Sequence, residues 1–199
     1  LETVFGVGRA DKGESLIEKK VINAKSTRDA ILSGIALIPE DRRGQGVSVT
    51  LPIDENIALP ILPQFLGKFG LMRNRIAEHA NALVDTLSIR TPNAGVLAGT
   101  LSGGNQQKVV LAKWLSTDAR IFLFDEPTQG VDVGAKGEIY ALIHDLAAQG
   151  RGILMVSSDM EEVLSVADRV LAMRSGRIVG EFENLTLSAS RVVDAITNG

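Results

Sequence analysis

The chain contains no cysteine among its 199 residues, which excludes a disulfide framework and thiolate chemistry and is compatible with a reducing cytoplasm. Aromatic residues make up only 4% of the sequence. No apolar run approaches the length that a membrane-spanning helix needs, so we expect any work at a membrane to go through a partner. Hydrophobic residues still make up 45%, which is enough for the core of one domain.

The net charge is also small, and histidine is scarce. A formal net charge of −3 gives no electrostatic reason to expect a nucleic acid as partner. The only histidines are His79 and His144, too few for a histidine-based metal site. We therefore expect neither nucleic acid nor a histidine-ligated metal.

Residues 101–108, LSGGNQQK, stand at the start of a segment with helical patterning. A helix start exposes unpaired backbone N–H groups and the positive end of the helix dipole, so it suits an anion such as phosphate. Gly103 and Gly104 lack the Cβ atoms that would hold a phosphate away. Ser102 can cap the helix or donate its hydroxyl to a phosphate oxygen. An ordinary Ser-Gly-Gly cap is the alternative.

Residues 121–124, IFLF, form an apolar run typical of a strand buried on both faces, and two carboxylates, Asp125 and Glu126, follow it. Ligands bind at the carboxyl ends of strands in open α/β sheets. One carboxylate can hold the hydration shell of Mg²⁺ and the next can orient a water molecule. A solvated strand end is the alternative. The residues GVD follow at 130–132.

These three segments, in this order, resemble ABC ATPases. LSGGNQQK resembles the signature motif, IFLFDEP the Walker B strand with its following carboxylate, and GVD the D-loop. Three segments are similar in sequence to a narrower group within this family: residues 39–46 (PEDRRGQG), 125–136 (DEPTQGVDVGAK) and 156–163 (VSSDMEEV). This group is the C-terminal nucleotide-binding half of the fused ATPase subunit of bacterial monosaccharide importers, of the ribose, xylose and galactose type. The resemblance runs over essentially the whole chain.

The resemblance implies an α/β fold of the ABC-type P-loop NTPase class, a mainly parallel sheet with flanking helices and an inserted helical subdomain. Residues 1–199 would form one partial nucleotide-binding domain. Its α/β core would lie at 1–51 and 117–199, and its helical subdomain, with the signature motif, at 52–116. The turn at 8–13 has the glycine spacing of a P-loop, but Glu14 stands where a lysine is required. We therefore expect an N-terminally truncated domain that begins after its P-loop.

The function implied by the resemblance is that of the ATP-hydrolysing subunit of a bacterial sugar importer, with ATP and Mg²⁺ as cofactors. The signature residues would complete, in trans, an ATP site held by another nucleotide-binding half; they are Leu101, Ser102, Gly103, Gly104 and Gln106. The site of this half itself would use Asp125, which holds Mg²⁺ indirectly, with Glu126, Glu40, Ser158 and the D-loop residue Asp132.

Two positions depart from the general family pattern. A glutamine usually stands where this chain has Glu40 or Asp41, and a histidine usually stands where it has Ser158. A serine donates one hydrogen bond but lacks the charge and reach of an imidazole. We therefore expect this half's own site to be weak or inactive. Because the P-loop is absent, we also expect the isolated chain to lack ATPase activity.

The implied partners are an N-terminal nucleotide-binding half or a second ATPase subunit, transmembrane permease subunits and, indirectly, a periplasmic sugar-binding protein. They would place the chain peripherally at the cytoplasmic face of the inner (plasma) membrane. One alternative is a non-catalytic half that only clamps nucleotide held by its partner. The other is a soluble ABC ATPase acting on ribosomes or DNA, against which the charge and the importer-like wording count.

Overall fold

The computed structural model describes residues 1–184 and 188–198 and divides the chain into two compact units, 1–154 and 155–199. Among these described residues, no helix is both long enough and apolar enough to cross a membrane. The strands and helices of the first unit, up to the strand that leaves it, are β1 (Ser15–Ile17), β2 (Lys20–Ile22), α1 (Thr27–Leu32), β3 (Ile35–Ile38), a π-helical turn (Arg42–Gly46), α2 (Ile53–Ala58), a 3-10 segment (Leu59–Phe65), β4 (Leu66–Gly67), β5 (Gly70–Leu71), α3 (Arg73–Thr86), a 3-10 turn (Ala98–Thr100), α4 (Gly103–Leu115), β6 (Ile121–Asp125), α5 (Val133–Ala148) and β7 (Gly152–Val156).

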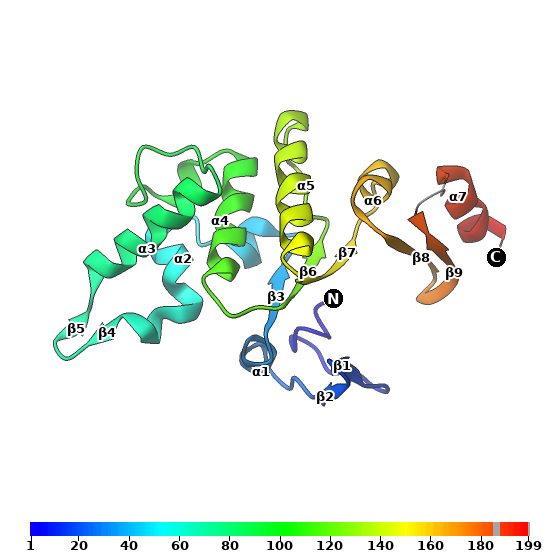
Figure 1. Ribbon diagram of the computed structural model, residues 1–199, viewed down its shortest axis with the longest axis horizontal. Helices are drawn as coiled ribbons and strands as arrows, with labels where there is room; N and C mark the ends of the chain where they lie inside the picture. Colours follow the sequence, from blue (N-terminus) through cyan, green and yellow to red (C-terminus); the bar gives the residue numbers. More distant parts are fainter. Residues whose placement is uncertain (185–187, 199) are drawn as a thin grey trace. The chain divides into compact units, whose positions relative to one another are not determined.

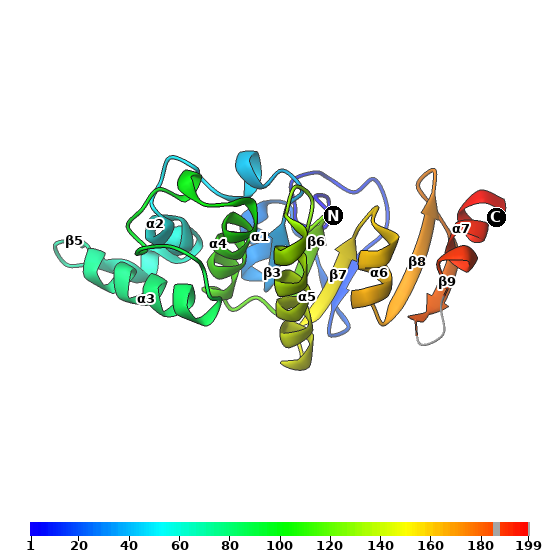
Figure 2. The same cartoon turned by 90° about the horizontal axis from the view of Figure 1, so that it is seen from above.

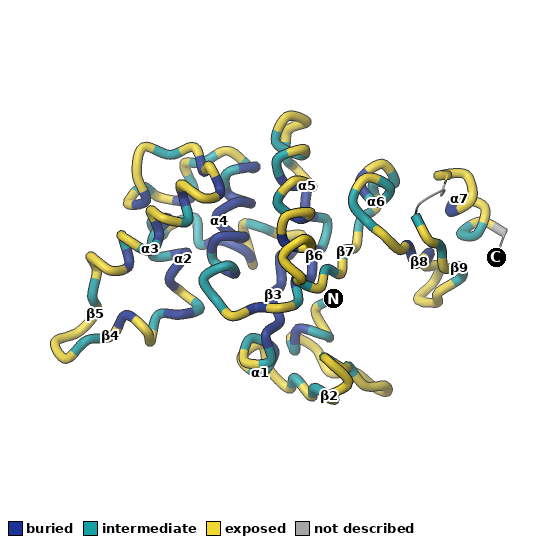
Figure 3. The backbone as a smooth tube through the Cα atoms, viewed as in Figure 1, coloured by how far each residue is buried: buried dark blue, intermediate teal, exposed yellow. Residues whose placement is uncertain are grey.

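A parallel pair of strands forms the centre of the first unit. β3 pairs with β6 in parallel, with Ile38 opposite Phe124, and the sheet order is β3-β6-β7. Every residue of β3 is buried, and so are the three central residues of β6 (Figure 3). The predicted buried strand and the largely parallel α/β sheet are thus confirmed. Because the strands run in parallel, both carboxyl ends open at the same edge of the sheet.

The segment expected to be a helical subdomain, 52–116, contains α2, α3 and α4, together with the small β4–β5 hairpin. Figures 1 and 2 both show α4 between α2 and α3 on one side and α5 on the other. α4 also contacts β3, so this helical segment packs against the sheet within one compact unit. The division between the two compact units falls within β7. The subdomain boundaries at 51 and 116 stay a prediction.

Helix α1 begins at a serine that caps it. The hydroxyl of Ser26 accepts a hydrogen bond from the N–H of Asp29 at 3.2 Å. The helix ends before Gly34, whose φ of +81° suits glycine. Gly34 leads directly into β3, and its carbonyl accepts bonds from the N–H groups of Arg120 and Ile121. These bonds fix where β6 starts against β3.

The second unit contains α6 (Met160–Val166), β8 (Arg169–Arg174), β9 (Arg177–Glu183) and α7 (Ala189–Asn198). β8 and β9 form an antiparallel hairpin around Ser175 and Gly176, both of which have positive φ. α7 contacts both strands and buries Val192. α6 starts at Asp159, whose carboxylate accepts the N–H groups of Glu161 and Glu162 at 3.0 and 3.3 Å.

Candidate functional site

Ser102 stands at the N-cap position of α4, but its side chain makes no capping hydrogen bond. Its hydroxyl oxygen instead accepts a hydrogen bond from the side-chain Nδ2 of Asn105 at 3.0 Å. Ser102 is exposed, while the helix behind it is buried over most of its length. The sequence left two uses for the Ser102 side chain open, a helix cap and a donor to phosphate. The capping bond is not formed in the structure.

The two glycines of LSGGNQQK are in close contact with the segment that follows β6. A Cβ atom on Gly103 would lie 2.8 Å from the carbonyl oxygen of Gly130, and one on Gly104 would lie 2.7 Å from the Cβ of Ala135. Real Cβ atoms do not approach so closely, so both positions need glycine for the packing of the chain itself. Close packing is therefore a second reason for glycine at these positions, in addition to the access for phosphate that the sequence suggested.

LSGGNQQK and the GVD segment share one small pocket of about 150 Å³. Ser102, Gly104 and Asp132 all line it, so the structure brings these predicted site residues together. The full lining is Arg90, Ser102, Gly104, Asn105, Asp132, Gly134, Ala135 and Glu138. Asp132 also caps α5, since its Oδ1 accepts the N–H of Ala135 at 3.0 Å.

Gln106, one of the predicted signature residues, lies inside the protein. Its side chain is fully buried; Nε2 donates to the carbonyls of Ala98 and Leu101 at 3.3 and 3.1 Å, and Oε1 accepts from Nε of Arg43 at 3.4 Å. Its backbone N–H bonds to the carbonyl of Ser102. Gln106 thus holds the loop from inside, because the helical turn directs position 106 to the core. Its role toward a nucleotide stays a prediction.

A charge network that the sequence did not reveal borders the same pocket. The ammonium group of Lys108, 5% exposed, lies 2.7 Å from Oε2 of Glu138 and donates to the carbonyl of Ser88 at 3.1 Å. Arg90 donates to Oε1 of Glu138 at 3.1 Å. The hydrogen bond and the charge of Lys108, with the charge of Arg90, lower the pKa of Glu138. The network joins α4, α5 and the segment after α3.

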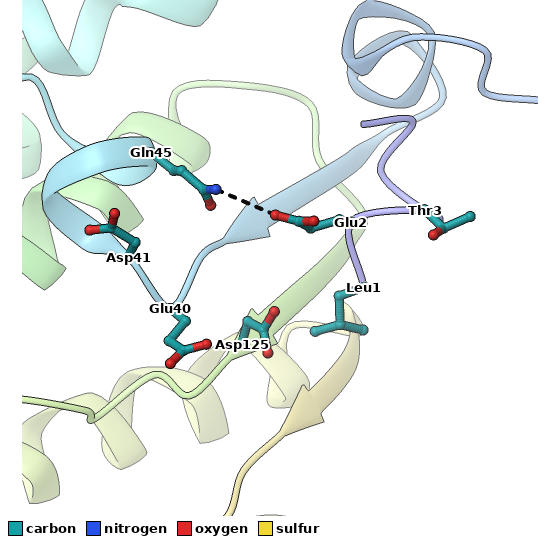
Figure 4. A pocket seen from close by; sticks show the side chains of 7 residues that line it. All are labelled: Leu1, Glu2, Thr3, Glu40, Asp41, Gln45 and Asp125. Carbon is teal, nitrogen blue, oxygen red and sulfur yellow. Dashed lines mark hydrogen bonds between the residues drawn. The ribbon is translucent and has the colours of Figure 1, made fainter. Parts of the chain in front are cut away.

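At the carboxyl ends of the paired strands lies the second group of predicted site residues. Glu40 follows β3 and Asp125 ends β6; both line an open pocket of about 610 Å³ (Figure 4). The rest of the lining comes from Leu1, Glu2, Thr3, Asp41 and Gln45. Gln45 donates to Glu2 at 3.4 Å. With four carboxylates around it, this pocket suits a cation or a cation-bearing ligand.

Burial raises the pKa of Asp125, and the negative charges of Glu40, Glu126 and Glu2 raise it further, while the N-terminal ammonium of Leu1 acts in the opposite direction. Glu126 has a φ of +45°, a left-handed backbone that a non-glycine residue adopts uncommonly. The turn after β6 is therefore both electrostatically and conformationally strained.

The acidic pocket shows no ligand set for a directly bound metal among the described residues. Among residues 1–184 and 188–198, no group of three or more histidine, cysteine or acidic side chains is arranged to hold one. Carboxylate oxygens are nevertheless the donors that Mg²⁺ prefers, and this ion usually keeps several waters and phosphate oxygens as ligands. The carboxylates of this pocket are therefore of the chemical type that such an ion takes, and the role of Asp125 toward Mg²⁺ stays a prediction.

Arg42 connects the two pockets. Its NH1 lies 3.5 Å from the carbonyl oxygen of Gln129. A Cβ atom added to Gly103 would lie 3.1 Å from its NH2. Gln129 in turn donates from Nε2 to Glu40 at 3.2 Å. Burial, followed by the charge of Arg43, lowers the pKa of Arg42. A partly buried guanidinium therefore ties the loop after β3 to both the GVD segment and LSGGNQQK.

Ser158 lies in the second unit, directly after Ser157 and before the cap of α6. The neighbouring Ser157 hydroxyl donates to Oε2 of Glu162 at 2.5 Å, and Glu162 is 1% exposed. This bond fixes the backbone next to Ser158. The role of Ser158 with the carboxylates of the first unit stays a prediction.

Comparison with known proteins supports both the fold and the motifs. The sequence profile described as "ABC transporter" matches residues 1–129. A ribose import ATP-binding protein of Rubrobacter xylanophilus is 46% identical over 195 residues, which cover 98% of this chain and 39% of that protein. A xylose import ATP-binding protein of Moorella thermoacetica is 44% identical over 191 residues, covering 95% and 37%.

A galactose/methyl galactoside import ATP-binding protein of Fusobacterium nucleatum is 42% identical over 181 residues, covering 90% of this chain and 36% of that protein. The chain thus spans less than half the length of these relatives. Among solved structures, an ATP-binding cassette of an ABC transporter superposes with a TM-score of 0.77 at 23% identity. It covers 98% of this chain and 80% of the other, so the fold agrees.

The raised pKa of Asp125 predicts how stability depends on pH. Between 3.8, the ordinary pKa of this carboxyl, and its raised folded value, the folded chain binds more protons than the unfolded chain, so stability falls as pH rises through this window. We expect Asp125→Asn to raise the melting temperature at pH 7, and the difference to disappear as the pH is lowered to about 4. Thermal unfolding of both proteins across this range measures it.

The control for this prediction is Asp85→Asn, which changes an exposed aspartate on α3. It should leave the melting temperature unchanged at every pH in the series. An Asp125→Asn protein that melts at or below the parent temperature at pH 7 would show that burial and like charges do not strain this carboxylate.

The buried end of the charge network gives a second prediction. Glu138→Ala leaves the ammonium of Lys108 inside with only the Ser88 carbonyl as partner. Because Glu138 is about half-exposed and water can enter, we expect a loss of roughly 2 kcal/mol in the free energy of unfolding, between the values for exposed and fully buried pairs. Urea denaturation of the chain measures this loss.

Arg73→Ala is the comparison, since it opens the exposed pair between Arg73 and Glu55. Its cost should be below about 1 kcal/mol. Equal losses for the two variants would mean that Lys108 gains nothing from its burial against Glu138.

Proposed function

Because this chain belongs to the ABC transporter family, we propose that it is the C-terminal nucleotide-binding part of the ATPase that powers a bacterial sugar importer. The printed names of its relatives support this: they are ribose, xylose and galactose import ATP-binding proteins. The importer activity is proposed for the longer subunit to which such a part contributes. Which sugar is carried would be set by the permease and the sugar-binding protein.

One observation carries the proposal. The Ser102 hydroxyl is exposed, makes no capping bond and lies in one pocket with Gly104 and Asp132. A neutral hydroxyl beside the backbone N–H groups of a helix start suits the terminal phosphate of a nucleotide. No lysine lines this pocket, and under the proposal another half brings the nucleotide with its own phosphate loop.

The acidic pocket would serve the nucleotide site of this half itself. Asp125 would hold Mg²⁺ through its water shell, and Glu126, at the strained turn, would orient the attacking water. Mg²⁺ would supply charge neutralisation at the phosphates. The carboxylates that line this pocket support the assignment, since the charges of Glu40, Glu126 and Glu2 raise the pKa of Asp125 and a cation would offset them.

A second candidate is a half that clamps nucleotide without hydrolysing it. Glu40 supports it, because its carboxylate accepts a hydrogen bond from Gln129 and stands where the general family has a glutamine. A glutamine amide can donate a hydrogen bond to an attacking water. A carboxylate only accepts, and it adds negative charge near that water. Under this candidate, LSGGNQQK keeps its role in trans, and Asp125 and Glu126 contribute little to turnover.

The proposed partners follow from the same assignment. A second nucleotide-binding half would supply the phosphate loop, and permease subunits would hold the pair at the cytoplasmic face of the inner membrane. A solved cassette with a TM-score of 0.75 to this chain is described as a dimer in a post-hydrolysis state with ADP and phosphate. A composite site between two such domains accords with the exposure of LSGGNQQK at the surface of this chain.

Ser102→Arg tests the proposal in the assembled importer that contains this chain. The long cationic side chain would fill the space where hydroxyl and phosphate meet, so we expect ATP turnover to fall by about a hundredfold, as when a preorganised donor is lost. Since Ser102 is exposed and makes no capping bond, the melting temperature should move by less than about 2 °C. Steady-state ATPase rate and melting temperature are measured on the same protein.

Ser26→Arg is the matched control. The side chain of Ser26 makes the capping bond of α1, and Ser26 is far from Ser102 in the sequence. It should lower the melting temperature and leave turnover near normal. Gly103→Asp is a poorer probe than Ser102→Arg, since a Cβ at this position meets the Gly130 carbonyl at 2.8 Å. Near-normal turnover of Ser102→Arg would contradict the role in trans.

A further inference from the structure

The side-chain amide of Asn105 has a defined orientation. The backbone N–H of Arg90 can only donate, and it lies 2.9 Å from Oδ1 of Asn105. The oxygen of the amide must therefore face Arg90, which turns its NH₂ group toward Ser102. Amide orientations are often ambiguous, but here a backbone donor decides the matter.

This orientation has a consequence for the Ser102 hydroxyl. Nδ2 of Asn105 can only donate, so Oγ of Ser102 is the acceptor in the 3.0 Å bond between them. The hydroxyl hydrogen is therefore not used toward Asn105, and the side chain makes no capping bond either. One lone pair of Oγ is therefore occupied from the side of the helix, and neither of these two contacts uses the hydroxyl hydrogen.

The donor in this arrangement is the backbone N–H of Arg90, and the backbone around it is held by neighbouring contacts. Ile89, next to Arg90, is buried, and the carbonyl of Ser88 accepts a bond from Lys108 at 3.1 Å. The guanidinium of Arg90 is bonded to Glu138 of α5 at 3.1 Å. Positions 105 and 108 of α4 lie on the same side of the helix, so the loop 88–90 is bonded to α4 at two points.

We propose that the backbone N–H of Arg90 and the side chain of Asn105 form a hydrogen-bond relay that keeps the Ser102 hydroxyl hydrogen directed at an anionic ligand in the pocket. Asn105 is thus a positioning residue that acts through Ser102. This inference rests on the proposed function, in which this ligand is the terminal phosphate of a nucleotide. A preorganised donor is stronger than a freely rotating one because no reorientation is needed when the anion arrives.

A purely structural role for Asn105, as a polar residue in the first turn of α4, gives different expectations. In that case its replacement lowers stability, and any loss of activity is independent of what stands at position 102. Under the relay, stability hardly changes, and the loss of activity depends on the Ser102 hydroxyl. A double-mutant cycle between the two positions separates these roles.

The experiment measures kcat/KM for ATP in the assembled importer. Ser102→Ala should lose about tenfold to a hundredfold, the worth of one hydrogen bond to a charged group. Asn105→Ala should lose roughly threefold to tenfold, because the hydroxyl is then free to rotate. Asn105→Asp should lose more than Asn105→Ala, since a carboxylate only accepts and draws the hydroxyl hydrogen away from the ligand.

The same two changes at Asn105 are then made in the Ser102→Ala background. Because no hydroxyl remains to be directed, both double variants should match Ser102→Ala to within about twofold. All variants should melt within about 2 °C of the parent. Asn81→Ala, an exposed asparagine on α3, is the control and should leave both measurements unchanged.

The outcomes distinguish the relay from the function on which it rests. Normal kcat/KM in Ser102→Ala would overturn the proposed function. A clear loss in Ser102→Ala with normal activity in both Asn105 variants would overturn the relay alone. An Asn105→Asp loss that persists in the Ser102→Ala background would also overturn it, because the effect would then come from charge repulsion that does not pass through the hydroxyl.

Discussion

Burial of helix α4 is the constraint on which the first unit depends. Most of its residues, from Gly104 to Trp114, are buried, and the helix contacts the sheet as well as α2, α3 and α5. A helix enclosed in this way cannot shift or turn without disturbing every neighbour, because protein interiors are close-packed. Its first residue, however, must reach the surface. The position of Ser102 is therefore set by the whole packed unit and not by the loop that carries it.

Polar side chains on the buried faces of α4 make this enclosure specific. Gln106 bonds to two carbonyls of its own loop and to Arg43, and Lys108 pairs with Glu138. A buried polar group without a partner costs free energy, so these side chains favour a single register of α4 against its neighbours. The Lys108–Glu138 pair joins α4 to α5, which begins at Asp132. Two parts of the candidate site are thereby held in one arrangement.

The two pockets differ in electrostatic character, as their proposed uses require. Four carboxylates line the pocket at the strand ends, and like charges there raise the pKa of Asp125. The pocket beside Ser102 offers a hydroxyl and a helix start. The first suits a cation together with its phosphates, and the second suits a phosphate that arrives already neutralised in part. Between them, Arg42 bonds to the carbonyl of Gln129, and Gln129 bonds to Glu40.

The sequence by itself determined the parallel α/β class, the buried strand before Asp125 and the helix start after Ser102, because each depends on local order: an apolar run, adjacent carboxylates, a Ser-Gly-Gly turn. Only the tertiary structure decided which side chains of LSGGNQQK face outward. Gln106 is turned to the core, whereas Asn105, one residue earlier, meets the N–H of Arg90 across 15 residues of sequence. Helical rotation places neighbouring residues about 100° apart, and which of them is enclosed depends on the elements packed around the helix, whose positions no short motif records.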